Sequence, residues 1–129
     1  MNSSGINLDD LAATVDGPWK PRVAAHMNDW ALKLARFAGT YVWHAHHDTD
    51  EVFLVIAGDI EIDLRDAQGE STVRLGRNDV FVVPRGVEHR PSSVDGAVVV
   101  MVEPADTLSI GNYAGTLPPA ITATTGLDS

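Results

Sequence analysis

From residue 22 onwards, apolar and polar residues alternate in short runs with a period of two, which is the pattern of half-buried β-strands. Turn signals rich in Gly, Asn and Asp separate the runs, for example Gly58-Asp59 and the sequence GRND at 76–79. No segment between them is long enough for a crossover helix, so the pattern predicts an antiparallel, all-β sandwich or closed barrel. The predicted strands are 22–27, 30–37, 40–46, 51–57, 59–65, 71–75, 79–83, 87–91 and 96–103.

The two ends of the chain differ from this pattern. The N-terminal sequence GINLDDLAATVDG predicts a short helix, because Asn7 can cap it and Asp9 and Asp10 suit the positive end of the helix dipole. After Pro104 the residues are small and polar, which is typical of an extended and partly disordered tail. The predicted division is therefore a helix and lead-in over 1–21, a barrel over 22–104, and a C-terminal extended tail over 105–129.

Two predicted strands, VFLVIA at 52–57 and AVVVMV at 97–102, are apolar at every position. A strand with one solvated face would alternate, so both faces of these strands must be covered. The barrel interior can cover one face. The other needs the N-terminal segment or a second subunit, and we expect a homodimer.

Composition narrows the classes of function. A chain of 129 residues with a net charge of −9 has the length of one domain and a charge that repels phosphate backbones, so nucleic acid is an unsuitable partner. No apolar run approaches the roughly 20 residues that span a bilayer, and there is no signal-peptide pattern, so we expect a cytoplasmic protein without membrane attachment. Since the chain has no cysteine, any metal must be held by His, Asp or Glu.

The sequence YVWHAHHDTDEVFLVIAG contains three of the five histidines. On a strand over 40–46, His44 and His46 would point to the same face and His47 away from it. Tyr41 and Trp43 alternate with the histidines and should lie on the outer face. Glu51 opens the next predicted strand and can return beside the two imidazoles, where a buried carboxylate needs a partner or a metal. A solvated turn with incidental histidines is the alternative.

This segment resembles the first sequence motif of the cupin superfamily, G-x5-H-x-H-x(3,4)-E-x6-G. His44, His46, Glu51 and Gly58 occupy the motif positions, and Gly39 lies one residue closer to the first histidine than the motif requires.

The later segment NDVFVVPRGVEHRP resembles the second cupin motif, G-x5-P-x-G-x2-H-x3-N. Pro84, Gly86 and His89 match it. Asn78 replaces the first glycine, which is a substitution that a left-handed turn tolerates, and Ser93 replaces the final asparagine.

The chain is therefore similar to small single-domain bacterial cupins, of the group often labelled mannose-6-phosphate-isomerase-like. The resemblance implies a double-stranded β-helix (jelly-roll) barrel that holds one divalent metal ion per chain. The implied ligands are His44, His46, Glu51 and His89.

Iron, nickel, manganese, zinc and copper all accept such a ligand set, and the sequence does not choose among them. Four ligands leave a six-coordinate metal two open positions, as needed by a metal-dependent enzyme of the isomerase, lyase or dioxygenase type that acts on a small organic molecule. A tetrahedral zinc would be saturated by the same four, and the protein would then be a non-catalytic binding or sensing module with a structural metal.

An organic ligand also needs an apolar pocket wall. The candidates are the apolar residues of the predicted strands around the histidines, for which plain barrel core is the alternative. They are Val42, Phe53, Val55, Ile60, Ile62 and Val82.

Overall fold

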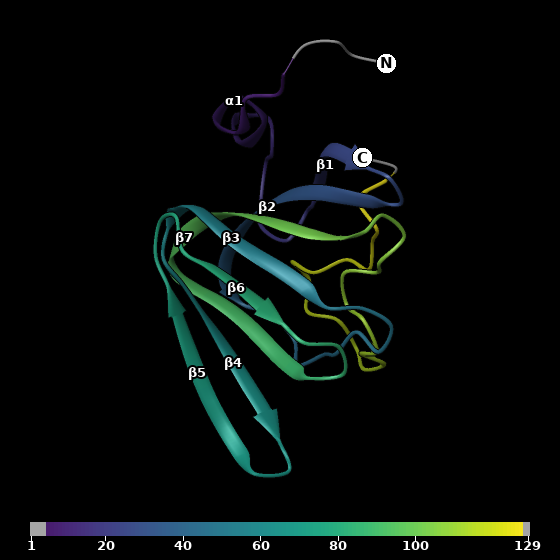
Figure 1. The fold of residues 1–129 in the computed structure, drawn as a ribbon. Helices are drawn as coiled ribbons and strands as arrows, with labels where there is room; N and C mark the ends of the chain where they lie inside the picture. Colours follow the sequence, from purple (N-terminus) through teal and green to yellow (C-terminus); the bar gives the residue numbers. More distant parts are fainter. Residues whose placement is uncertain (1–4, 128–129) are drawn as a thin grey trace.

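Seven antiparallel strands make up about half of residues 5–127, the part of the chain that the computed structural model describes (Figure 1). The hydrogen-bonded order is β1-β2-β7-β3-β6, and β4 joins the sheet through β7 and carries β5 on its other edge. The predicted all-β fold is confirmed. The strands are β1 (Arg22–Met27), β2 (Trp30–Thr40), β3 (Glu51–Gly58), β4 (Ile60–Asp66), β5 (Gly69–Leu75), β6 (Val80–Val83) and β7 (Glu88–Pro104).

The predicted N-terminal helix is present as α1 (Leu8–Ala13). Asn7 caps it, since its Oδ1 accepts a hydrogen bond of 2.9 Å from the backbone N–H of Asp10. Ala12 and Val15 then pack with Leu34 of β2 against the outside of the sheet. No helix in the described part of the chain has the length and hydropathy to span a membrane. The first four residues of the predicted 1–21 segment lie outside the described residues.

Strand β7 corrects the sequence prediction, which placed two strands with a turn at 92–96 between them. The chain passes through this segment as one strand, whose first half pairs with β4 and whose second half pairs with β3. The pairing of β7 with β2 shifts register between Phe37 and Gly39, and Gly96 has a φ of +94°. Such an irregularity bends a strand so that its two halves can pair with different neighbours, which is why turn residues occur inside it.

The predicted strand over 40–46 is also wrong, because only an isolated bridge forms there. The backbone N–H of His44 donates to the carbonyl of His89 at 3.1 Å, and the N–H of His89 donates back at 2.8 Å. On its other edge the segment has no neighbouring strand, and the C-terminal tail lies there instead. Strict alternation of side chains is therefore lost in this segment.

The tail contains no strand over residues 105–127, and it packs against the barrel. Ile110 and Ile121 are buried in the main hydrophobic core, and the chain folds back beside the barrel (Figure 1). Small and polar residues lie before, between and after these two buried positions. Residues 128–129 of the predicted tail lie outside the described residues.

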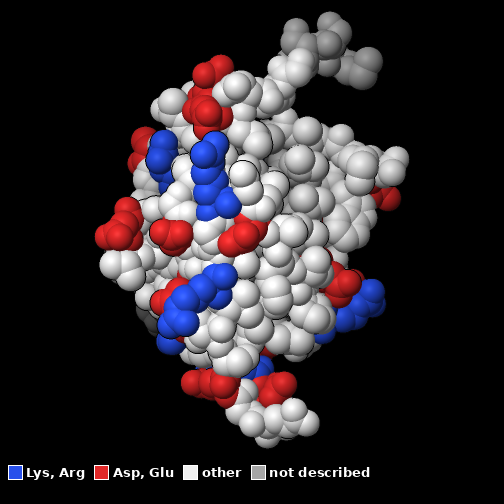
Figure 2. Space-filling model, turned by 60° about the vertical axis from the view of Figure 1, so that its left-hand side comes forward, with Lys and Arg blue, Asp and Glu red and all other residues white. Residues whose placement is uncertain are grey.

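Charged side chains are distributed over the surface in mixed sign. Figure 2 shows Lys and Arg lying near Asp or Glu on the face in view, without a continuous basic surface. Two arginines on the barrel wall illustrate this, since Arg65 pairs with Glu88 and Arg90 pairs with Asp63. Both guanidinium groups also stack on the ring of Trp43, at 4.1 and 4.8 Å from its centroid, so Trp43 lies on the outer face as its position in the sequence predicts.

Candidate metal centre

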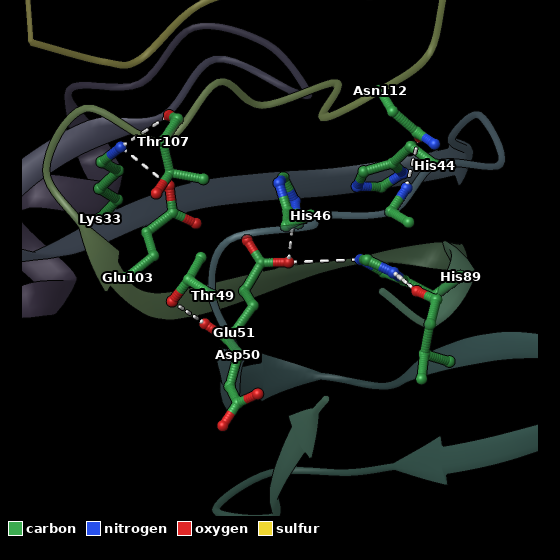
Figure 3. Close-up of polar contacts among 12 residues, drawn as sticks. Lys33, His44, His46, Thr49, Asp50, Glu51, His89, Glu103, Thr107 and Asn112 are labelled. Atoms are coloured by element: carbon green, nitrogen blue, oxygen red, sulfur yellow. Dashed lines mark hydrogen bonds and ion pairs between the residues drawn. The ribbon is translucent and has the colours of Figure 1, made fainter. Parts of the chain in front are cut away.

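Four side chains from three separate segments meet inside the barrel (Figure 3). His44 and His46 come from residues 40–46, the segment with the isolated bridge (the bridge segment). Glu51 comes from the first position of β3, and His89 from the start of β7. One potential ligand atom from each lies within 4.8 Å of all the others, and all four residues are buried. The cluster that the sequence predicted is therefore assembled.

Backbone carbonyls set the orientation of two of the imidazoles. Nδ1 of His44 lies 2.9 Å from the carbonyl oxygen of Val42, and Nδ1 of His89 lies 3.0 Å from that of Val87. A carbonyl can only accept, so each Nδ1 carries the proton and each Nε2 presents its lone pair to the centre of the cluster. This arrangement is typical of metal-binding histidines.

The donor atoms fit a cation better than they fit one another. Oε1 of Glu51 lies 3.3 Å from Nε2 of His89 and 3.5 Å from Nε2 of His46, which is buried without a hydrogen-bond partner. Because Nδ1 of His89 donates to a carbonyl, the lone pair of its Nε2 faces the carboxylate, which is repulsive. A divalent cation at the centre would turn each of these contacts into an attraction.

The protonation states also suit a metal. Burial, with a smaller effect of His89, lowers the pKa of His44 to about 3, so its imidazole is neutral at physiological pH. Burial alone would raise the pKa of Glu51, but a hydrogen bond with Glu103 contributes most to holding it well below its ordinary value. Metal ligands must be neutral imidazoles and ionised carboxylates, and these two residues meet that requirement before any metal binds.

A buried lysine–carboxyl pair that was not predicted from the sequence lies beside the cluster. Nζ of Lys33 lies 2.8 Å from Oε2 of Glu103 and donates a second hydrogen bond of 3.2 Å to the carbonyl of Thr107. Burial and the neighbouring Glu51 raise the pKa of Glu103 to about 9, against the influence of Lys33. The signal was available in the sequence, because Lys33 occupies an inward position of β2, in phase with the buried Ala31 and Ala35.

This pair and the cluster both line a cavity of about 40 Å³. Trp19, Phe37 and Met101 supply apolar walls, while His44 and Glu51 face it from the cluster. The cavity has room for one or a few water-sized groups. A second, open hollow of about 320 Å³ lies on the other side of the bridge segment, between residues 45–49 and the tail, and His46 lines it.

The predicted pocket residues have different positions. Phe53 lines the cavity. Val42, Val55, Ile60 and Ile62 belong to the hydrophobic core, which was the alternative for each of them.

The expectation for Val82 is wrong. In the pairing of β6 with β3, Val83 lies opposite Glu51 and faces inward, so Val82, opposite Val52, faces outward and is 46% exposed. A shift of one residue along the strand therefore exchanges the inward and the outward position.

Two residues beside the histidines test the predicted alternation. Tyr41, predicted to face outward, lines the cavity instead, with its ring 5.3 Å from that of His44, and burial raises its pKa to about 12. His47 is exposed and points away from the cluster, as predicted.

The protein is therefore an antiparallel β-barrel of the jelly-roll class. Its interior holds three histidines and one glutamate that form a potential metal centre. Comparison of the sequence with protein families matches residues 35–103, more than half of the chain, to the family described as "Cupin domain". The chain belongs to the cupin family, and the jelly-roll fold expected from the resemblance is confirmed.

Individual relatives agree with this assignment. The uncharacterized protein YdbB of Bacillus subtilis is 39% identical over 79 residues, which cover 61% of this chain and 67% of YdbB. A crystal structure of a cupin-2 domain protein from Shewanella frigidimarina is 39% identical, with a TM-score of 0.72 over 77% of this chain and 93% of that one. Hydroquinone 1,2-dioxygenase from Sphingomonas sp. TTNP3, solved with 4-hydroxybenzoate bound, shares the fold at 21% identity, with a TM-score of 0.64 over 78% of this chain and 74% of that one.

Proposed function

We propose that this cupin is a metal-dependent enzyme that acts on a small organic molecule. The observation that carries the proposal is the buried, unpartnered Nε2 of His46, which faces the Glu51 carboxylate inside a group of four potential ligands. A buried imidazole nitrogen without a partner is costly unless something binds it. A divalent metal of the iron, nickel, manganese, zinc or copper type is the group that these donors suit.

His44, His46, Glu51 and His89 would hold the metal, which supplies Lewis acidity or activates dioxygen when bound. Other groups of the chain orient these ligands and line the site. Backbone carbonyls fix the tautomers of His44 and His89, and Trp19, Phe37 and Phe53 form an aromatic wall on the inner side.

The size of the two hollows bears on the substrate. Organic ligands occupy pockets of roughly 300–1,000 Å³, so the inner cavity of about 40 Å³ suits a small reactant or one end of a substrate. The open hollow of about 320 Å³ beside His46 has the size for the remainder. Hollows of these sizes are compatible with an isomerase, a lyase or a dioxygenase.

A ligand titration separates this proposal from a structural-metal module that binds or senses without turnover. We expect protein purified without chelators to contain about one divalent metal per chain. After loading with Co(II), azide should change the visible absorption spectrum in a saturable way, because a catalytic metal retains an exchangeable position. A spectrum that no added small ligand changes would favour the non-catalytic alternative.

We also propose that two copies of the chain form a dimer. Helix α1 covers only part of the outer sheet face, and an apolar patch continues beyond it on β3, β6 and β7, in which Val80 is 60% and Val82 46% exposed. The patch consists of Val52, Leu54, Val80, Val82 and Val102. A second copy that packs its own patch here would form a two-fold symmetric contact.

Light scattering should give the mass of a dimer at micromolar concentration, and Val82→Lys should shift it to a monomer. Val94→Lys is the matched control, because Val94 is 92% exposed on the bend of β7. A wild-type monomer would mean that α1 alone is enough cover for this face. The cytoplasmic location and the isomerase-like subgroup stay predictions from the sequence.

A further inference from the structure

We propose that Asn112, in the C-terminal tail, is a positioning residue for the metal centre and that it acts through Ala45, the residue between His44 and His46. The inference rests on the proposed metal binding. The tail would then contribute to the metal centre from outside both cupin motifs, which end before residue 94.

The first support is a pair of hydrogen bonds that replaces a missing strand. His44 uses its backbone to bridge to His89 of β7, so the backbone groups of Ala45 point to the opposite edge. There, Oδ1 of Asn112 accepts a hydrogen bond of 2.8 Å from the N–H of Ala45, and the N–H of Asn112 donates one of 3.1 Å to the carbonyl of Ala45. One tail residue thus satisfies both polar groups of a backbone unit that is 1% exposed.

The second support is the close approach of the tail to this segment. A Cβ on Gly111 would lie 2.4 Å from the carbonyl oxygen of Ala45 and 3.2 Å from Cδ2 of His44, so only glycine allows the observed contact. The φ of Gly111 is +52°, which also favours glycine. The turn is anchored by the buried Ile110, whose carbonyl accepts from the N–H of Tyr113 at 2.9 Å.

The side-chain amide of Asn112 also has a defined orientation. Its Nδ2 lies 3.2 Å from Nε2 of the exposed His47, which leaves Oδ1 directed at Ala45. His47 is thus a supporting contact, and the bond to Ala45 is the one that reaches the ligands.

The consequence for the site follows from the position of Ala45. Any displacement of this peptide unit moves the imidazoles of His44 and His46 together, and these are two of the four potential ligands. Outer-shell contacts that orient metal ligands are typically worth about 10–100-fold in affinity. The remaining two residues, Glu51 and His89, lie on the regular strands β3 and β7.

The test compares two conservative, exposed substitutions. Asn112→Asp keeps an oxygen acceptor at the same distance along the side chain, whereas Asn112→Gln moves it by one methylene group. Each protein is titrated with Co(II) against a competing chelator, its visible absorption spectrum is recorded, and its urea midpoint is measured without metal. Tyr113→Phe is the control for the tail, because it removes only the hydrogen bond from the Tyr113 hydroxyl to Thr116.

We expect Asn112→Gln to bind Co(II) about 10–100-fold more weakly with an altered spectrum. Asn112→Asp and Tyr113→Phe should stay within about threefold of the wild type with its spectrum, in low salt and in 0.5 M NaCl, where the added charge of Asp is screened. Equal affinities and spectra for Asn112→Gln and Asn112→Asp would overturn the proposal, as would a change confined to the urea midpoint. Failure of the wild type to bind any metal would instead refute the proposed function.

Discussion

Replacing Glu51 by glutamine is expected to weaken divalent-metal binding by more than the roughly 100-fold that the loss of an outer-shell contact costs. Glu51 is the only carboxylate among the four clustered residues, and it faces both His46 and His89. Glutamine has nearly the same shape but lacks the charge that offsets the metal's charge inside the barrel. Competition with a chromophoric chelator measures the affinity of each protein.

The matched control is Asp48→Asn, which makes the same chemical change three residues earlier in the exposed turn. Its affinity should equal that of the wild type. If instead Asp48→Asn lost the metal while Glu51→Gln retained it, the ligand set would extend into the turn, and the four-residue cluster would not be the metal site.

The sequence predicted the elements that depend on local pattern. The period of two located most strands, and Asn7 was correctly assigned as the helix cap. The four potential ligands followed from motif spacing, because H-x-H on an extended segment and a glutamate at the head of the next strand meet whenever the barrel closes.

The errors have a common physical origin in long-range pairing. Strand β7 continues through residues that favour turns because its two halves pair with different strands, and the bridge segment lacks a neighbouring strand on one edge. With regular alternation lost, Tyr41 turns inward. The contact of Asn112 with Ala45 joins positions 67 residues apart, and no local pattern encodes such a contact.

The buried pair of Lys33 and Glu103 is another such contact, and its two members should respond unequally to substitution. Glu103→Leu is expected to destabilise the protein by about 3–5 kcal/mol, because it leaves the Lys33 ammonium buried with only the carbonyl of Thr107 as partner. Lys33→Met should cost less, about 1–3 kcal/mol, because the carboxyl of Glu103 can remain protonated. Urea unfolding of the metal-free proteins at pH 7 measures both.

The pH dependence of stability provides an independent check on this asymmetry. The pKa of Glu103 is raised to about 9 in the folded protein, whereas an exposed carboxyl titrates in the acid range. The folded state therefore binds more protons than the unfolded state at neutral pH, and stability should fall as the pH rises from about 7 towards 9. His44 does not contribute there, because above its ordinary pKa it is neutral in both states. In Glu103→Leu this decline should be absent.

The double variant Lys33→Met with Glu103→Leu decides whether the pair stabilises the fold. Replacing both partners leaves no buried charge, and apolar residues of similar volume often restore or exceed the original stability. We therefore expect the double variant to be more stable than Glu103→Leu alone, by about 2 kcal/mol or more. A double variant as unstable as the sum of the two single ones would show that the residues act independently, despite the 2.8 Å between them. If the double variant matches the wild type in stability, the pair is dispensable for folding. Its principal role would then lie at the cavity, beside Glu51.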